Sequence, residues 1–174
     1  MREEAKNTKK LDNKGFSLIE LIIVIAIMAI LIGIVGTQVV PYIEKSKQAK
    51  DQQVLSGLLT SATTAFASNA ELVKEGTAYT FKIDGTTTST GTLDAKVINE
   101  FYELAGLKKN DAAGASVNGD LATLKSKMTS KAGADIKEVS INRSKEGVVT
   151  VKTETNSSKY NNVFADLSST WTKY

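Results

Sequence analysis

The pattern of apolar and polar positions divides the chain into a polar start, a long apolar run and a patterned remainder. Residues 1–15 are polar and basic, whereas residues 16–40 are almost wholly apolar. Residues 21–40 carry no charge, and crossing a hydrocarbon core takes about 20 residues of helix, so this run can span a membrane. The core of an ordinary signal peptide is shorter, roughly 7 to 15 residues, and the length therefore favours a membrane span.

The charges on either side of the run predict its orientation. The basic leader favours a cytoplasmic N-terminus, which sends the rest of the chain outward. Lys45, Lys47 and Lys50 lie on the far flank and weaken this asymmetry. The orientation therefore depends partly on the motif described below.

Beyond Pro41 the hydrophobic period becomes that of an amphipathic helix. Apolar residues recur there at spacings of three and four, at Val54, Leu55, Leu58, Leu59, Ala62, Ala65 and Phe66. This helix is expected to fade between Ser68 and Gly76, and its apolar face is expected to pack on a head domain.

The rest of the chain alternates between strand and short-helix patterns. Period-two alternation predicts strands at residues 79–83, 139–142 and 149–152, with the last two joined as a hairpin by residues 144–147, and a final strand at residues 160–164. Asp84-Gly85 is a turn dipeptide, and residues 86–92 are expected to form a loop or an edge strand. Thr92 or Asp94 can cap a helix that Gly106 ends, and residues 121–128 form another short helical pattern.

These elements predict an α+β fold in which a long N-terminal hydrophobic helix continues into an amphipathic helix packed on a small antiparallel sheet. The expected organisation is a leader at residues 1–15, a hydrophobic helix at residues 16–44 and a globular head at residues 45–174. Within the head we expect a helix at residues 45–73, a mixed region at residues 74–130, and the sheet and C-terminal segment at residues 131–174.

Composition excludes several classes of chemistry. The chain contains no cysteine and no histidine, which excludes disulfides, thiolate metal sites and cysteine nucleophiles and removes the usual general base. The net charge of +3 is small and acidic residues alternate with basic ones, so the head is not expected to bind nucleic acid. No phosphate-binding loop or nucleophile-base set is present, and we expect neither enzyme activity nor a cofactor. Asn110, Asp111, Asn118 and Asp120 could supply oxygens to calcium, but their spacing favours a polar surface loop over a metal site.

Glu20 is the anomaly of the apolar run. An ionised glutamate at hydrocarbon depth costs about 2.5 to 3.5 kcal/mol, so such a residue usually faces a partner instead of lipid. It could alternatively sit near the headgroups and extend toward water.

Further along the run, four small residues cluster on one helix face, where they would allow close helix contact: Ala26, Ala29, Gly33 and Gly36. Gly33, Gly36 and Pro41 also weaken the helix, which is expected to kink or melt easily there.

The sequence KGFSLIELIIVIAIMAIL, within residues 14–40, resembles the N-terminal segment of type IV prepilins and the related type II secretion pseudopilins. The resemblance implies a pilin-like roll, cleavage after Gly15 by a membrane prepilin peptidase, and N-methylation of the new terminal residue, Phe16. The family's glutamate corresponds to Glu20. In the family a proline usually lies about one turn earlier than Pro41, so the resemblance does not fix where the helix melts.

The resemblance implies a structural subunit of a type IV pilus. Such a subunit is inserted in the cytoplasmic membrane with its N-terminus inside, contacts lipid and an assembly platform, and polymerises with itself and other pilins into an extracellular fibre for adhesion, twitching motility or aggregation. Phe16, Glu20, Ala26, Ala29, Gly33, Gly36 and Pro41 are the residues expected to serve assembly. A secretion or competence pseudopilin is the alternative, and a single-span anchored binding domain or enzyme is a third possibility.

Electrostatics supports a role for Glu20 independently of the resemblance. Cleavage at Gly15 creates a positive α-amino group on Phe16, and the nearest compensation inside a packed bundle is a carboxylate. The pair can form between neighbouring subunits or within one chain, since Glu20 lies four residues along the same helix.

At the other end of the chain, Trp171 is expected to pack on the sheet, and an exposed Trp171 would indicate an adhesive or inter-subunit contact instead.

Overall fold

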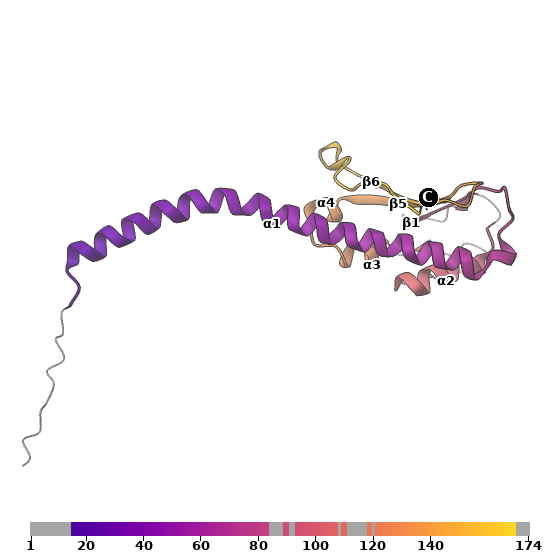
Figure 1. Cartoon of the computed structure of the whole chain (residues 1–174), viewed down its shortest axis with the longest axis horizontal. Helices are drawn as coiled ribbons and strands as arrows, with labels where there is room; N and C mark the ends of the chain where they lie inside the picture. The colour runs from indigo at the N-terminus through magenta and orange to yellow at the C-terminus, as the bar shows by residue number, and fades with distance from the viewer. Residues whose placement is uncertain are drawn as a thin grey trace, which may run out of the picture. The chain divides into compact units, whose positions relative to one another are not determined.

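The computed structural model describes residues 15–83, 89–90, 93–107, 109–110, 118–119 and 121–169. The chain divides into two compact units, Met1–Pro41 and Tyr42–Tyr174. Helix α1 (Leu18–Ser68) contributes to both (Figure 1). Gly33, Gly36 and Pro41 lie within α1, and they leave it helical in this structure.

The first unit presents apolar side chains on every side of its helix. Its large apolar residues range from 43% exposed at Val39 to 90% exposed at Phe16. In the part of the chain that the structure describes, α1 is the one helix long and apolar enough to cross a membrane. A helix satisfies its backbone hydrogen bonds internally, so it is a stable form for this sequence in a medium without water.

The second unit, which we call the head, is built on an antiparallel sheet. Its strand order is β2–β1–β5–β6–β7, formed by β1 (Tyr79–Ile83), β2 (Ser89–Thr90), β5 (Ile136–Arg143), β6 (Val149–Thr155) and β7 (Leu167–Ser168). The strands predicted at residues 79–83, 139–142 and 149–152 are confirmed, and so is the hairpin between the last two. Gly147, at φ 87°, occupies the left-handed position of the hairpin turn, which favours glycine. A second sheet pairs β3 (Lys109–Asn110) with β4 (Asn118–Gly119).

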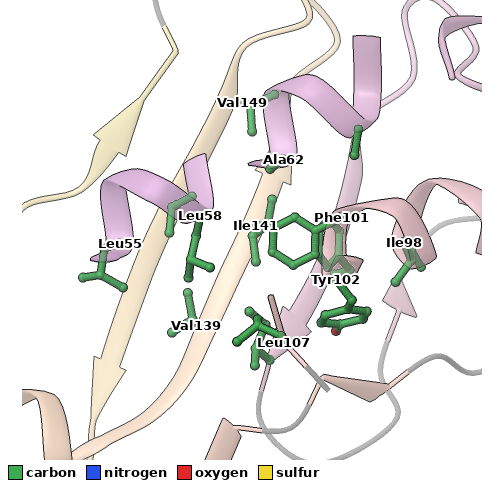
Figure 2. Close-up of a cluster of buried hydrophobic side chains, with 14 of the residues drawn as sticks. Leu55, Leu58, Ala62, Ile98, Phe101, Tyr102, Leu107, Val139, Ile141 and Val149 are labelled. Carbon is green, nitrogen blue, oxygen red and sulfur yellow. The ribbon is translucent and has the colours of Figure 1, made fainter. Parts of the chain in front are cut away.

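The core of the head lies where α1 crosses this sheet. Leu55, Leu58 and Ala62 occupy one face of α1 and pack over Val139 and Ile141 of β5 (Figure 2). Leu55, Ala62 and Ile141 are each no more than 1% exposed. The amphipathic pattern beyond Pro41 therefore identified the buried face of α1 correctly.

Helix α2 (Ala95–Ala105) closes the core with aromatic side chains. The ring of Phe101 lies 5.0 Å from that of Phe81, centroid to centroid, in an edge-to-face arrangement. The side chain of Asp94 accepts a hydrogen bond from the Lys96 N–H at the start of α2, and Gly106 ends the helix in the left-handed conformation, as predicted. Lys127 Nζ donates to the carbonyl of Gly106 at 2.9 Å and so supplies a cation at the C-terminus of α2.

Two short α-helices and two 3₁₀ turns complete the described helical elements of the head. They are α3 (Leu121–Ser126), which agrees with the helical pattern at residues 121–128, α4 (Lys131–Ala134) and two 3₁₀ turns, Ala70–Leu72 and Ser158–Tyr160. Neither α4 nor the two 3₁₀ turns had a counterpart in the sequence patterns, because three or four residues cannot establish a helical period.

The prediction of a final strand at residues 160–164 was wrong. The side chain of Ser157 accepts a hydrogen bond from the Lys159 N–H, which starts the 3₁₀ turn Ser158–Tyr160, and Asn162 adopts a left-handed φ of 64°. Neither conformation can continue a strand. The chain instead adds β7 to β6, with Val151 opposite Leu167, and Phe164 is buried at 6% exposed. The predicted turn at Asp84-Gly85 and the predicted packing of Trp171 lie outside the described residues.

Candidate functional site

The predicted cleavage position lies in exposed, non-helical backbone just before α1. Gly15, Phe16 and Ser17 precede the first helical residue, Leu18, and Phe16 is 90% exposed. Apart from Gly15 and its two chain neighbours, no heavy atom lies within 4 Å of where a Cβ on Gly15 would be. A protease needs an accessible segment without regular structure, and residues 15–17 are exposed and non-helical.

Glu20 folds back over the N-terminus of its own helix. Its Oε2 accepts a hydrogen bond from the Ser17 N–H at 2.8 Å, and the Leu21 N–H donates to the Ser17 carbonyl at 3.2 Å. A glutamate at the third helical position that bonds the backbone N–H of the capping residue is half of a capping box. The carboxylate is therefore held at the positive end of the α1 dipole, beside the position where cleavage would create the α-amino group of Phe16.

The small residues of the apolar run remain uncovered in this structure. Ala26, Ala29, Gly33 and Gly36 are all exposed, and apart from its chain neighbours and the nearby backbone of α1, no atom lies within 4 Å of where a Cβ on either glycine would be. Beside Gly36 the surface has an apolar hollow of about 350 Å³, which is lined by Leu31, Ile32, Val35, Gly36 and Val39. Gly36 contributes no side chain to fill this hollow. Pro41 is also exposed and lies at the end of this unit.

The head contains a polar cluster that the sequence analysis missed. Asp51 of α1 is 0% exposed, and its carboxylate accepts hydrogen bonds from the N–H groups of Thr129 at 2.8 Å and Ser130 at 2.9 Å, as well as from both hydroxyl groups. The Ser130 hydroxyl in turn caps α4 by accepting from the Gly133 N–H. A Cβ at Gly133 would collide with Asp51 Oδ2 and lie 2.8 Å from Met128 Cβ, so this contact requires glycine.

A second carboxylate of α1 supports the same docking. Glu44 Oε1 accepts from the Lys131 N–H at 2.7 Å. Together, Glu44 and Asp51 satisfy three consecutive backbone N–H groups, those of residues 129–131, at the start of α4. This arrangement fastens α4 to α1 and contains no nucleophile or base directed at open space, so its role is structural.

The remaining polar features of the head do not form a reaction centre. Glu100 accepts from the buried Asn69 amide, which places it in a structural contact. At the edge of β5 and β6 an open polar cleft of about 350 Å³ is lined by Lys137, Thr153, Glu154, Thr155, Tyr160, Asn161 and Asn162. Within the described ranges, no group of three or more acidic residues could hold a metal ion. Asp111 and Asp120 of the suggested calcium loop lie outside the described residues.

The exposed carboxylate of Glu146 has a lowered pKa. Hydrogen bonds from the Ser144 hydroxyl and from its own backbone N–H hold the pKa of Glu146 below its ordinary value, and the nearby Lys145 acts in the same direction. Glu146 lies in the hairpin turn between β5 and β6, so this shift reflects turn formation.

Comparison with known proteins bears on the N-terminal segment. Residues 10–36 match the model of the prokaryotic N-terminal methylation motif. The chain carries the leader signature of type IV pilins and pseudopilins. This leader is a structural and processing signal, and it implies cleavage by a prepilin peptidase, insertion in a membrane and assembly with other pilins. No curated protein and no solved structure matches the chain.

The matched segment includes most of the residues singled out from the sequence. Gly15, Phe16, Glu20 and the four small residues fall within residues 10–36, whereas Pro41 and the whole head lie beyond it. The methylation motif therefore supports a type IV pilin-like or pseudopilin-like protein through its N-terminal segment.

Proposed function

We propose that this chain is a structural subunit of a type IV pilus. It is inserted in the cytoplasmic membrane as a prepilin, cleaved after Gly15, N-methylated on Phe16 and polymerised into an extracellular fibre. The observation that carries the proposal is the methylation motif at residues 10–36, followed by a helix that is apolar on every side. Under this proposal residues 1–15 are the leader, residues 16–44 the assembly helix and residues 45–174 the head.

The exposed apolar side chains of α1 support the proposal, because they need an apolar environment both before assembly and in the fibre. Burying a large aliphatic side chain is worth about 1.5 to 3 kcal/mol, so a helix with this much uncovered apolar surface is not stable in water. Lipid covers it before assembly, and the helices of neighbouring subunits cover it in the fibre. The hollow beside Gly36 and the small face formed by Ala26, Ala29 and Gly33 provide places where a second helix can approach closely.

The position of Glu20 supports its part in assembly. Only Oε2 is engaged by Ser17, and a carboxylate has two oxygens, each able to accept more than one hydrogen bond. The Phe16 ammonium of an adjacent subunit can therefore pair with Glu20 without loss of the helix cap. This pairing would neutralise two charges that are costly in an apolar fibre core.

Replacement of Glu20 tests the proposal. Expressed with a prepilin peptidase and an assembly platform, the wild-type chain should yield a mature protein of residues 16–174 with one methyl group on Phe16, measured by intact mass. Glu20→Ala should still be cleaved but should reduce the amount of fibre sheared from cells by at least ten-fold, because the ammonium of each incoming subunit would lack its counter-ion. Glu75→Ala removes an exposed carboxylate of the head and should leave fibre yield unchanged.

Several outcomes would contradict the proposal. A purified chain that retains Met1, or that is cut after the apolar run, would indicate a simple membrane anchor instead. Normal fibre yield from Glu20→Ala would contradict the assembly role of the carboxylate. Deleting the gene and measuring adhesion, twitching motility and aggregation of the cells then shows which of these roles the fibre serves.

A pseudopilin of a secretion or competence system is the alternative, because the methylation motif belongs to both kinds of protein. Long surface filaments that contain this chain favour the pilin. A deletion strain that keeps its surface filaments but is defective in secretion or DNA uptake favours the pseudopilin.

A further inference from the structure

The head begins with a ring of exposed aromatic and basic side chains on α1. Tyr42, 70% exposed, is the first residue of the head, and Lys45, Lys47 and Lys50 follow it, all exposed. We call these four residues the basic collar. They come directly after the uncharged residues 21–40, so a membrane-spanning α1 carries the collar into the layer where hydrocarbon gives way to headgroups.

The acidic residues of the same stretch do not neutralise the collar. Glu44 accepts the Lys131 N–H, and Asp51 is fully buried against Thr129 and Ser130, so both carboxylates are directed at the head. None of the ion pairs found in the described residues includes a lysine of the collar. The surface of this segment is therefore cationic although its sequence contains both signs of charge.

The lysines are distributed around the helix instead of along one face. We measure each angle about the axis of α1 from the buried Asp51, at about 100° per residue. Lys45 lies roughly 120° to one side of Asp51 and Lys50 roughly 100° to the other side. Lys47 lies between Asp51 and Lys50. A protein partner covers one face of a helix, whereas the headgroup layer surrounds a spanning helix on every side that the head leaves open. The distribution therefore fits lipid better than a single protein partner.

The heights of the side chains also fit a headgroup layer. With a rise of about 1.5 Å per residue, Lys45, Lys47 and Lys50 lie roughly 4.5 Å, 7.5 Å and 12 Å beyond Tyr42. Lys45 and Lys47 fall within a headgroup layer of about 5 to 8 Å in each leaflet, and the long side chain of Lys50 can reach back to that layer. Helical side chains tilt toward the N-terminus, which here is the direction of the apolar run. Lys45 shows this tilt, because its Nζ lies 5.8 Å from the centroid of the Tyr42 ring. Tyrosine and lysine are typical anchors at this depth.

We propose that the basic collar binds the phosphate groups of anionic phospholipids in the leaflet on the side of the head. Tyr42 places its ring at the boundary of the hydrocarbon, and the three ammonium groups contact headgroup phosphates around the helix. The interaction holds the unassembled subunit at a fixed depth and enriches anionic lipid around it. It depends on membrane insertion of α1 and does not depend on whether the chain later forms a pilus or a secretion fibre.

Lipid selectivity of the full-length chain tests the proposal. The chain is reconstituted in phosphatidylcholine vesicles that contain trace spin-labelled phosphatidylglycerol or spin-labelled phosphatidylcholine, and electron paramagnetic resonance gives the fraction of each lipid immobilised by the protein. We expect several-fold selectivity for phosphatidylglycerol, which high salt weakens. The triple variant Lys45→Gln, Lys47→Gln, Lys50→Gln should lose most of it, up to roughly five-fold for each lysine in contact.

A second triple variant controls for net charge. Lys74→Gln, Lys145→Gln, Lys159→Gln removes three exposed lysines elsewhere in the head and should keep the wild-type selectivity. Circular dichroism of both variants establishes that the fold is intact. Absence of selectivity in the wild type, or an equal loss in the two variants, would overturn the proposal. So would a collar variant that retains lipid selectivity but fails to assemble, because the lysines would then serve a contact between subunits.

Discussion

Among single residues, Asp51 has the most demanding environment in the head. It is a fully buried carboxylate with no cation at hydrogen-bond distance among the described residues, and its charge is balanced by two backbone N–H groups and two hydroxyl groups. Hydrogen bonds to a charged group are worth about 1.5 to 3 kcal/mol each, and a buried donor left without an acceptor costs about 1 to 3 kcal/mol. Asp51 is therefore placed to contribute a large part of the stability of the head.

Asp51→Ala should lower the free energy of unfolding by about 3 kcal/mol or more, because it leaves the N–H groups of Thr129 and Ser130 buried without acceptors. Chemical denaturation of the full chain in detergent micelles measures the change. Asp166→Ala is the matched control, since this aspartate forms an ion pair with Lys152 while its side chain is 62% exposed. It should cost no more than about 1 kcal/mol. Equal effects of the two substitutions would show that the buried contact adds nothing specific.

The two important carboxylates of α1 differ in how visible they are in the sequence. Glu20 stands out because it is a charge in an apolar run, where lipid offers no partner. Asp51 lies among lysines and glutamines, where a polar residue of an amphipathic helix is assigned to solvent. Its partners lie 78 and 79 residues further along the chain, in a segment with no strong period of its own. Only the tertiary structure brings these groups together.

Among the elements, those with a local signal were predicted from the sequence. Alternation at Tyr79, Phe81 and Ile83 identified β1 because these side chains face the core, and Asp94 with Gly106 identified both ends of α2. The last strand was misplaced because Tyr160, Val163 and Phe164 are apolar without alternating regularly. The side chains of Val163 and Phe164 cover the core from a turn, so burial there does not require a strand.

The capping of α2 can be tested at this scale. The Asp94 carboxylate accepts from the Lys96 N–H at 2.8 Å, and α2 carries the buried Phe101 and Tyr102. Asp94→Ala should lower the stability of the head by about 1 kcal/mol, whereas Asp94→Ser should retain most of it, because serine can cap the same N–H group. Thermal unfolding followed by circular dichroism measures both variants. A loss from Asp94→Ser as large as that from Asp94→Ala would contradict the capping role.

Across the whole molecule, the two units meet opposite requirements. The buried apolar residues of the described chain begin at Leu55 and end at Phe164, so the core belongs wholly to the head. The described residues of the first unit, 15–41, include no buried residue, and the large apolar side chains among them are exposed instead. Its fold is therefore specified by a surrounding medium, whether lipid or other subunits, whereas the head has a core that can form in water.

A chain shortened to residues 42–174 tests this division. It keeps every residue of the core, the contacts of Glu44 and Asp51 with residues 129–131, and the five-stranded sheet. We expect a soluble monomer by size-exclusion chromatography that unfolds in one cooperative transition, and Asp51→Ala should lower its midpoint as it does in the full chain. A chain that starts ten residues earlier, at Ile32, regains part of the exposed apolar run and should self-associate without detergent, because it restores apolar surface and adds nothing to the core. Aggregation or loss of cooperative unfolding in the 42–174 chain would show that the apolar segment is needed to fold the head, and that the two units are not independent.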